Sequence, residues 1–201
     1  MASDHKLNGK RVAILATDGV EQAELAEPRK ALNGAGAKTT LVSLKPGMIK
    51  GWQHDHWGDE FPVDVTIDQA RAEDFDALML PGGVMNPDRL RMDDRAVNFV
   101  KMMFNAGKPI AAICHGPWLL VEADVVRNRS VTSWPSLETD LRNAGADWSD
   151  QEVVTDMGIV TSRKPDDIPA FNKKMLEEFA EGIHRRPEAK VLAPEQTLAS
   201  R

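Results

Sequence analysis

The sequence predicts an α/β fold of the flavodoxin-like type, a three-layer sandwich with a mostly parallel central sheet. Short, continuous apolar runs at 11–16, 76–80 and 109–113 have the length and composition of buried parallel strands. Segments with helical character separate these runs, and such alternation is typical of a parallel sheet covered by helices. The chain of 201 residues is long enough for one domain with a full core. We expect an N-terminal arm over residues 1–9, one domain over 10–181 and a tail over 182–201.

The first third of the chain predicts a βαβ unit followed by an excursion. A strand over 11–16 precedes a helix over 21–34, which Gly34 and Gly36 terminate, and a second strand covers 38–44. Glycine and proline then interrupt the pattern from 46 to 68. We expect a hairpin excursion or an edge strand there, with 63–67 alternating as a small strand.

The rest of the chain continues the alternation. We expect the following elements in order: a short linker helix over 70–75, a strand over 76–80, a helix over 89–106, the strand over 109–113, a helix from Trp118, a strand over 131–133, a helix over 136–144 capped by Ser136, a hairpin of strands 152–156 and 159–162 around Met157–Gly158, and a terminal helix over 166–181.

Composition excludes several classes of function. The formal net charge is −6 and no basic run is present, which argues against nucleic-acid contact. The single cysteine cannot form an intramolecular disulfide, which suits a reducing compartment, and no apolar stretch reaches the length of a membrane span. We therefore expect a cytoplasmic protein without membrane contact. The absence of a GxGxxG or Walker sequence leaves nucleotide binding without support.

The strongest chemical signal lies at Cys114. The apolar run over 109–113 leads directly into Cys114, and Gly116 and Pro117 then allow a tight turn into a helix. This is a thiol version of the strand-to-helix elbow that presents a nucleophile, at a helix N-terminus that favours a thiolate. The alternative is a buried structural cysteine, since free cysteine is among the most buried residue types.

Two other predicted strands end in residues that could assist a thiol, because ligand sites in such sheets lie at the carboxyl ends of the strands. Glu21 follows the first strand, and a carboxyl group near a thiol can tune its protonation. The alternative for Glu21 is a solvated acid at the start of a helix. Gly82 and Gly83 could direct backbone N–H groups toward an oxyanion, although a glycine pair that ends a strand is usually only a turn.

Of the five histidines, His115 is a candidate site residue, and three others are interpreted as surface residues. The imidazole of His115 could orient a substrate or contact the thiol, but neighbouring side chains at an elbow normally diverge, so its role stays open. The segment 54–56, His-Asp-His, is interpreted as a solvated hairpin and predicts no metal site. His184 is interpreted as a surface residue. Arg163 could bind a carboxylate or form an ordinary ion pair.

The residues around Cys114, Ala-Ile-Cys-His-Gly-Pro over 112–117, resemble the PfpI/ThiJ superfamily, relatives of the class I glutamine amidotransferases. The segments 18–25, 75–83 and 161–167 support this resemblance in the same order. It implies Cys114 as the nucleophile, Glu21 as the acid that hydrogen-bonds the thiol, and His115 as the third member. The residue that best matches the acid partner of His115 is Asp88, supplied by a neighbouring subunit and shorter than the acid of the family. The N–H groups of Gly83 and His115 would form the oxyanion pocket.

The resemblance further implies a homodimer or larger homo-oligomer with the pocket at its interface, and no required cofactor. Members of the superfamily act as proteases, glyoxalases, deglycases or chaperones. Our leading hypothesis is a stress-response enzyme in which Cys114 attacks a small reactive carbonyl or a peptide. The alternatives are a redox sensor or holdase with an oxidisable Cys114 and, less favoured, a glutamine-amidotransferase subunit.

Overall fold

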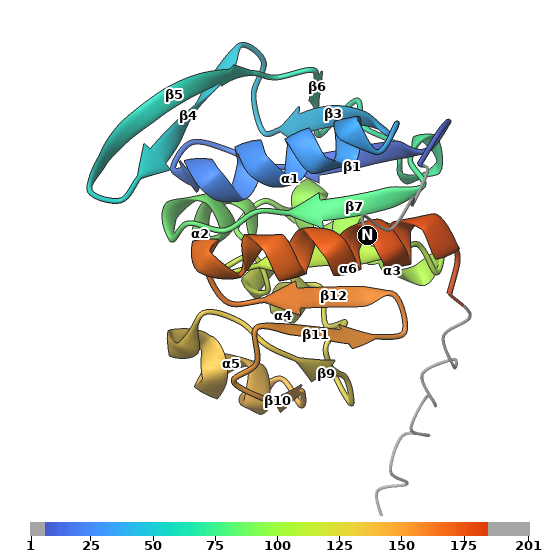
Figure 1. Ribbon diagram of the computed structural model, residues 1–201. Helices are drawn as coiled ribbons and strands as arrows, with labels where there is room; N and C mark the ends of the chain where they lie inside the picture. The colour runs from blue at the N-terminus through green and yellow to red at the C-terminus, as the bar shows by residue number, and fades with distance from the viewer. Residues whose placement is uncertain (1–6, 185–201) are drawn as a thin grey trace, which may run out of the picture.

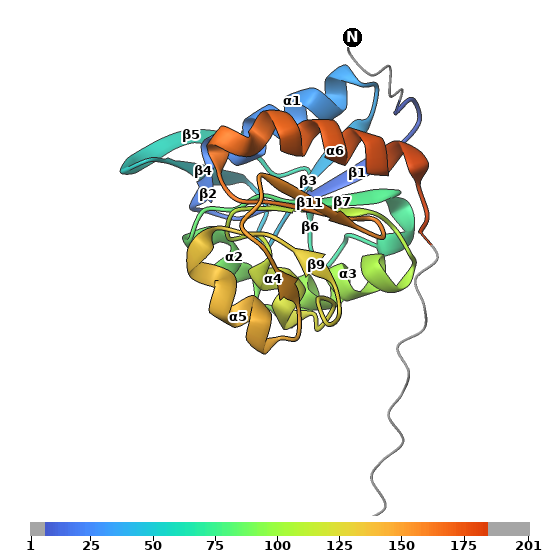
Figure 2. The same ribbon diagram turned by 60° about the horizontal axis from the view of Figure 1, so that its bottom comes forward.

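The computed structural model describes residues 7–184, which form three layers around a seven-stranded sheet (Figures 1 and 2). The strand order is β11-β12-β8-β7-β1-β3-β6, and all neighbours are parallel except β11 and β12. The strands of this sheet are β1 (Arg11–Leu15), β3 (Lys38–Ser43), β6 (Val65–Thr66), β7 (Ala77–Leu80), β8 (Ile110–Ile113), β11 (Val153–Asp156) and β12 (Ile159–Ser162). The predicted α/β sandwich with a mostly parallel sheet is confirmed.

Helices cover both faces of the sheet. The helices α1 (Gln22–Gly34) and α6 (Ile168–Glu181) lie side by side on one face (Figure 2). On the other face lie α2 (Met85–Leu90), α3 (Asp94–Asn105), α4 (Trp118–Glu122) and α5 (Glu138–Asn143). No helix within residues 7–184 is long and apolar enough to cross a membrane.

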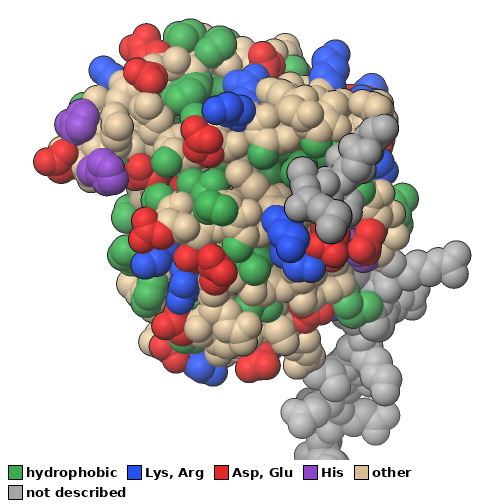
Figure 3. Space-filling view, in the orientation of Figure 1, with side chains coloured by type: hydrophobic (Ala, Val, Ile, Leu, Met, Phe, Trp, Pro, Cys, Tyr) green, Lys and Arg blue, Asp and Glu red, His purple; other side chains and the backbone are tan. Residues whose placement is uncertain are grey.

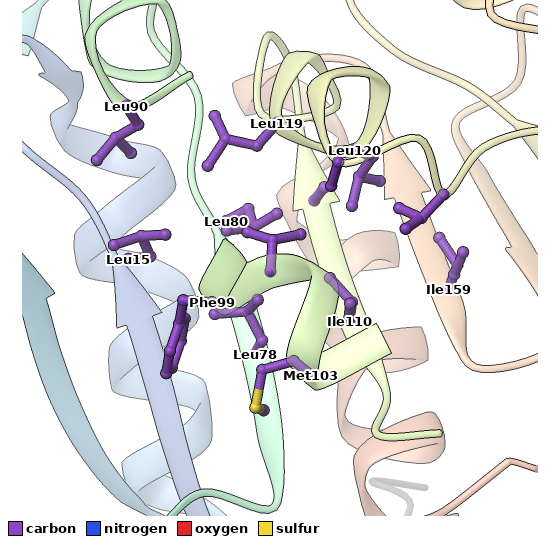
Figure 4. Close-up of a cluster of buried hydrophobic side chains, with 14 of the residues drawn as sticks. Leu15, Leu78, Leu80, Leu90, Phe99, Met103, Ile110, Leu119, Leu120 and Ile159 are labelled. Atoms are coloured by element: carbon purple, nitrogen blue, oxygen red, sulfur yellow. The ribbon is translucent and has the colours of Figure 1, made fainter. Parts of the chain in front are cut away.

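The alternation of side chains along the strands builds two separate cores. In β7, Leu78 and Leu80 point to one face while Met79 points to the other. Figure 4 shows Leu78 beside Phe99 and Met103 of α3, and Leu80 on the side toward Leu119 of α4. All of these side chains are at most 3% exposed, so the central strands are buried from both sides, which explains their continuous apolar sequence.

Two small sheets complete the fold. The strands β2 (Val20–Glu21), β4 (Met48–Gln53) and β5 (His56–Pro62) form one of them, and β4 and β5 form a hairpin that projects from the body (Figure 1). Histidine and acidic side chains gather at the end of this hairpin (Figure 3). The other sheet pairs β9 (Ser130–Val131) with β10 (Asp147–Trp148). The predicted hairpin excursion over 46–68 is confirmed.

Several predicted boundaries are wrong for local reasons. The expected helix over 89–106 is two helices, because Asp93 accepts hydrogen bonds from the backbone N–H groups of Arg95 and Ala96 and so caps α3. Ser136 is no cap, because it lies inside a 3₁₀ turn over Pro135–Leu137. Short 3₁₀ turns also replace most of the predicted linker helix, at Ala72–Asp74, and the start of the terminal helix, at Pro165–Asp167.

The predicted terminal segments are described only in part. Residues 7–9 belong to the packed body, because Leu7 is fully buried and its N–H donates to the carbonyl of Ala35 at 2.7 Å. His184 is also not the expected surface residue: its side chain is only 17% exposed and contacts Glu178 at 3.3 Å. Residues 1–6 of the predicted arm and 185–201 of the predicted tail lie outside the described residues.

Candidate active site

Cys114 occupies a strained turn between β8 and α4. Its φ is 62°, a left-handed conformation that is uncommon for a residue other than glycine. Hydrogen bonds hold the backbone of Cys114 on both sides. Its N–H donates to Ser162 O at 3.0 Å, and its carbonyl accepts from Trp134 N at 2.9 Å. A Cβ on Gly116 would lie 2.6 Å from Leu80 O, so the turn requires glycine there. The predicted elbow is therefore present, with the thiol at the carboxyl end of a central strand.

The carboxyl group beside this thiol belongs to Glu24, not to Glu21. Glu24 is fully buried, and its Oε2 accepts a hydrogen bond from the Gly82 N–H at 2.9 Å. A hydrogen bond between its carboxyl and the Cys114 thiol affects the pKa of both groups. Glu21 lies at the N-cap position of α1, where its side chain makes no capping hydrogen bond, and it lines the pocket. The expected contact between Glu21 and the thiol is thus corrected to Glu24.

Burial favours the uncharged form of both partners. It raises the pKa of Glu24 to about 8, with a smaller contribution from the charge of Glu21. Burial and the nearby Glu24 carboxylate also raise the pKa of the Cys114 thiol well above its usual value, while the N–H groups of Gly83 and His115 act in the opposite direction. At neutral pH the resting pair therefore consists of a carboxylic acid and a thiol that lie in contact.

The imidazole of His115 lies against the same sulfur. Its Nδ1 is 3.2 Å from Cys114 Sγ, although neighbouring side chains at an elbow were expected to diverge. The ring is fixed between two indoles, stacked on Trp134 with centroids 6.0 Å apart and edge-on to Trp118 at 5.1 Å. Burial lowers the pKa of His115 to about 4, so the imidazole is neutral at pH 7. A neutral ring nitrogen in contact with a thiol can accept its proton.

The two glycines after β7 have different tasks. Gly82 donates its N–H to Glu24, and a Cβ there would lie 2.4 Å from Glu24 Oε2 and 2.6 Å from Cys114 Cβ. Gly83 has φ 80° and directs its N–H at the Cys114 sulfur. Asn86 holds this loop, since its side chain donates to the carbonyls of Pro81 and Gly82 at 3.0 and 3.1 Å. Of the two glycines predicted as oxyanion donors, Gly83 lies beside the sulfur as well as the Glu24 carboxyl, while the N–H of Gly82 donates to Glu24.

Asp88 lies apart from these groups within the chain. It belongs to α2 and forms an ion pair with Arg91 at 3.2 Å, with half of its side chain exposed. Completion of the site by Asp88 of a neighbouring subunit concerns a second copy and stays a prediction. Arg163 forms ion pairs with Asp150 and Asp167, each at 2.8 Å. An ordinary ion pair was one of the two roles predicted for it.

A pocket of about 310 Å³ opens above the thiol. Its floor is formed by Cys114, His115, Glu24 and Gly83, and its wall includes Glu21. The rest of the lining comes from other segments of the fold: Gly19, Trp52, His54, Val84, Met85, Trp134 and Pro165. Cys114 is only 7% exposed, so the sulfur is reached through this pocket. The arrangement can hold a small carbonyl compound against the thiol.

Sequence reasoning missed Glu24, Asn86 and the aromatic wall of the pocket. A signal for Glu24 exists in α1: it lies four residues before Pro28 on the face that also buries Leu25 and Leu32. A carboxyl on the apolar face of a helix is unusual and marks a candidate site. His54 was interpreted as part of a solvated hairpin, yet it lines the pocket. Only the folding of the hairpin toward β2 brings it there.

The fold and this site define a cysteine-centred protein of the DJ-1/PfpI type. The model of the DJ-1/PfpI family matches residues 10–178, and the chain belongs to this family. Among curated relatives, General stress protein 18 of Bacillus subtilis is 45% identical over 170 residues, which is 84% of this chain and 96% of that protein. Protein/nucleic acid deglycase 2 of Escherichia coli is 43% identical over 169 residues, 83% of this chain and 96% of that protein.

A third relative and a solved structure agree with this assignment. The putative cysteine protease YraA of Bacillus subtilis is 42% identical over 167 residues, 83% of this chain and 96% of that protein. The crystal structure of Drosophila melanogaster DJ-1beta superposes with a TM-score of 0.77 at 29% identity, covering 85% of this chain and 90% of that chain. The names of the curated relatives support an enzyme of this family.

The raised pKa of Glu24 has a consequence for stability. Its folded pKa of about 8 exceeds its ordinary value of 4.5, so the native state binds more protons than the unfolded state between these two pH values. The contribution of Glu24 to stability is therefore largest below pH 4.5 and declines as the pH rises to 8. We expect the free energy of unfolding of the wild type, minus that of Glu24→Gln, to fall between pH 5 and pH 8. Urea unfolding of both proteins at the two pH values measures this difference, and a constant or rising difference would contradict the protonation of Glu24.

Proposed function

We propose that this protein is a cysteine-dependent enzyme that converts small reactive carbonyl compounds, of which methylglyoxal is the simplest example. The observation that carries the proposal is the convergence of three groups on Cys114 Sγ: the carboxyl of Glu24, the Nδ1 of His115 and the N–H of Gly83. A nucleophile, proton carriers and an oxyanion donor are the parts that addition to a carbonyl requires. The deglycase names of relatives support the same chemistry.

The first step is addition. The thiol proton moves to Nδ1 of His115 as the sulfur forms its bond to the aldehyde carbon, because the low pKa of His115 and the high pKa of the thiol disfavour a separate imidazolium–thiolate pair. The carbonyl π electrons move to its oxygen, which accepts a hydrogen bond from the Gly83 N–H and then takes the proton from the imidazolium. The product is a neutral hemithioacetal, and His115 returns to its neutral form. Glu24, protonated at neutral pH, donates its O–H toward the sulfur and so stabilises the transient thiolate.

The second step moves a proton between the two carbons of the adduct. The former aldehyde carbon loses its proton and the ketone oxygen gains one, which gives an enediol. The adjacent carbon then gains a proton while the hydroxyl on the sulfur-bearing carbon loses one, which gives a lactoyl thioester. His115 and Glu24 are the two groups in contact with the sulfur that can carry this proton. Water then cleaves the thioester, which releases lactate and restores the thiol. The sum is methylglyoxal plus water to lactate, and no external oxidant or reductant is consumed.

The pocket supports a small substrate over a protein chain. The sulfur is almost fully buried at the base of a cavity of about 310 Å³, which accommodates a small carbonyl compound but gives an extended polypeptide little access to the thiol. The proposal also includes a cytoplasmic location, supported by a single cysteine that is a free thiol, and the homo-oligomer that the family resemblance implies.

A two-substrate assay tests the proposal. The reduced wild type and Cys114→Ala are incubated in parallel with methylglyoxal, without glutathione, and with casein. We expect lactate from the wild type only, and no casein cleavage that depends on Cys114. A casein fragment formed by the wild type and absent with Cys114→Ala would favour the protease alternative. A stable sulfinic acid on Cys114 after mild peroxide, with no turnover of either substrate, would favour the redox sensor.

A further inference from the structure

Glu21, displaced from the thiol, lies in the wall of the pocket next to an indole. Glu21 in β2 pairs with Trp52 in β4 in the parallel register of the small sheet, so the two side chains are neighbours. Both line the pocket, as does Trp134 on another segment of the fold. The Trp52 Nε1 donates to His54 O at 2.8 Å, which fixes the tip of the hairpin beside Glu21. A carboxyl group in a pocket that aromatic side chains also line is a pattern that binds cations.

The lining of the pocket offers this carboxyl no permanent positive charge. No lysine or arginine is among the described residues that line the pocket, and within residues 7–184 the Glu21 carboxyl has no ion pair with either type. The nearby ionisable groups are His54, Glu24 and the Cys114–His115 pair. Of these, Glu24 and His115 are uncharged at neutral pH. Burial raises the pKa of Glu21 while the nearby His54 lowers it, and Glu21 is the acidic side chain that remains charged in the lining when Glu24 is protonated.

From this arrangement we propose that Glu21 is a specificity-determining residue that selects carbonyl substrates carrying a positive charge beyond the reacting carbon. The inference rests on the carbonyl chemistry proposed above and narrows its substrate class. The carboxylate would pair with an ammonium or guanidinium group while Trp52 and Trp134 cover its apolar surface. Glu21 and Cys114 line the same pocket, so one substrate can place its charged group against the wall while its carbonyl carbon lies at the thiol.

The test uses two arylglyoxals of equal shape. One carries a para-trimethylammonium group and the other a para-tert-butyl group, so the pair differs in charge but hardly in size. For each enzyme, the ratio of kcat/KM for the charged over the neutral compound removes general effects on catalysis. The intrinsic reactivities of the two compounds cancel when this ratio is compared between enzymes. The permanent charge of the ammonium group restricts any pH dependence to the enzyme.

We expect Glu21→Gln to lower this ratio about tenfold, through KM of the charged compound, because an ion pair present before and during the reaction strengthens binding uniformly. Glu21→Asp keeps the charge and should retain part of the preference. Glu27→Gln is the matched control, because Glu27 lies on the exposed side of the same helix, outside the pocket, and its ratio should equal that of the wild type. Added salt should reduce the wild-type ratio as well.

The outcomes separate the two proposals. An unchanged ratio in a folded, active Glu21→Gln enzyme would overturn the role of Glu21 and leave the carbonyl chemistry intact. A wild type that converts neither arylglyoxal nor methylglyoxal would overturn the proposed function itself. If Glu21→Gln does not fold, two experiments replace it. One measures the same kcat/KM ratio with Glu21→Lys, and the other measures equilibrium binding of benzyltrimethylammonium to the wild type. Binding weakened by salt supports the cation site, and absence of binding overturns it.

Discussion

Replacing Glu24 by glutamine is expected to lower kcat/KM for methylglyoxal by about 10²–10⁴, the usual range for loss of a group that transfers protons. Glutamine has nearly the same shape and can still accept the hydrogen bond from Gly82 N–H, which is 2.9 Å in the wild type. It cannot give up or take a proton. The loss should therefore appear in kcat as well as in kcat/KM, with little change in the far-ultraviolet circular dichroism.

The matched comparison for Glu24→Gln is Glu21→Gln, which makes the same change of side chain in the lining of the same pocket. Glu21 does not contact the sulfur, so its substitution should cost at least tenfold less activity on methylglyoxal. An equal or larger loss in Glu21→Gln would restore the role that sequence comparison with the family suggested for Glu21. Steady-state kinetics of the two variants, with lactate as the product measured, decide between the two carboxyls.

Replacing Gly82 by alanine is the second change with a large expected effect. The added methyl group would lie 2.4 Å from Glu24 Oε2, 2.6 Å from Cys114 Cβ and 2.8 Å from Ile113 O, distances too short for non-bonded atoms. Something must move, and the Glu24 carboxyl is the group with the most freedom to move away from the thiol. We expect a destabilisation of about 1–3 kcal/mol, typical of overpacking, together with a loss of activity of at least about 100-fold.

Gly34→Ala provides the matched control for Gly82→Ala. A Cβ on Gly34 would meet no atom within 4 Å, and Gly34 is the last residue of α1. Alanine at a helical position should leave stability unchanged or raise it by up to about 1 kcal/mol. Urea unfolding and the lactate assay on both variants test the prediction. A Gly82→Ala protein with wild-type stability and activity would show that the loop relaxes freely and that the close fit around Glu24 is dispensable.

The parts of the fold that follow from local pattern were predictable from the sequence. Continuous apolar runs predicted the central strands β1, β7 and β8, and the turn residues Met157–Gly158 predicted the hairpin of β11 and β12. The division between α2 and α3 was missed, although Asp93 carries the cap that produces it. Propensity alone supports a continuous helix there, and the single capping side chain overrides it.

The candidate site shows where such reasoning ends. Cys114 was predictable because its elbow is encoded in consecutive residues. Its partner was not, because Glu21 and Glu24 both lie near the start of one helix, and the choice depends on how α1 packs on the sheet. That packing buries Glu24 beside Leu25 and leaves Glu21 partly buried in the lining of the pocket. The contact of His115 with the thiol likewise depends on the left-handed backbone of Cys114, which residue type does not reveal.

The most direct test of the central claim is the rate of lactate formation from methylglyoxal, without glutathione, by the wild type, Cys114→Ser and Glu24→Gln at equal concentration. A thiol that reacts with carbonyls and depends on its carboxyl partner predicts steady turnover by the wild type, none above background with Cys114→Ser, and a loss of at least about 100-fold with Glu24→Gln. A folded, reduced wild type that forms no lactate, or a Cys114→Ser protein that forms it as fast as the wild type, would contradict the claim.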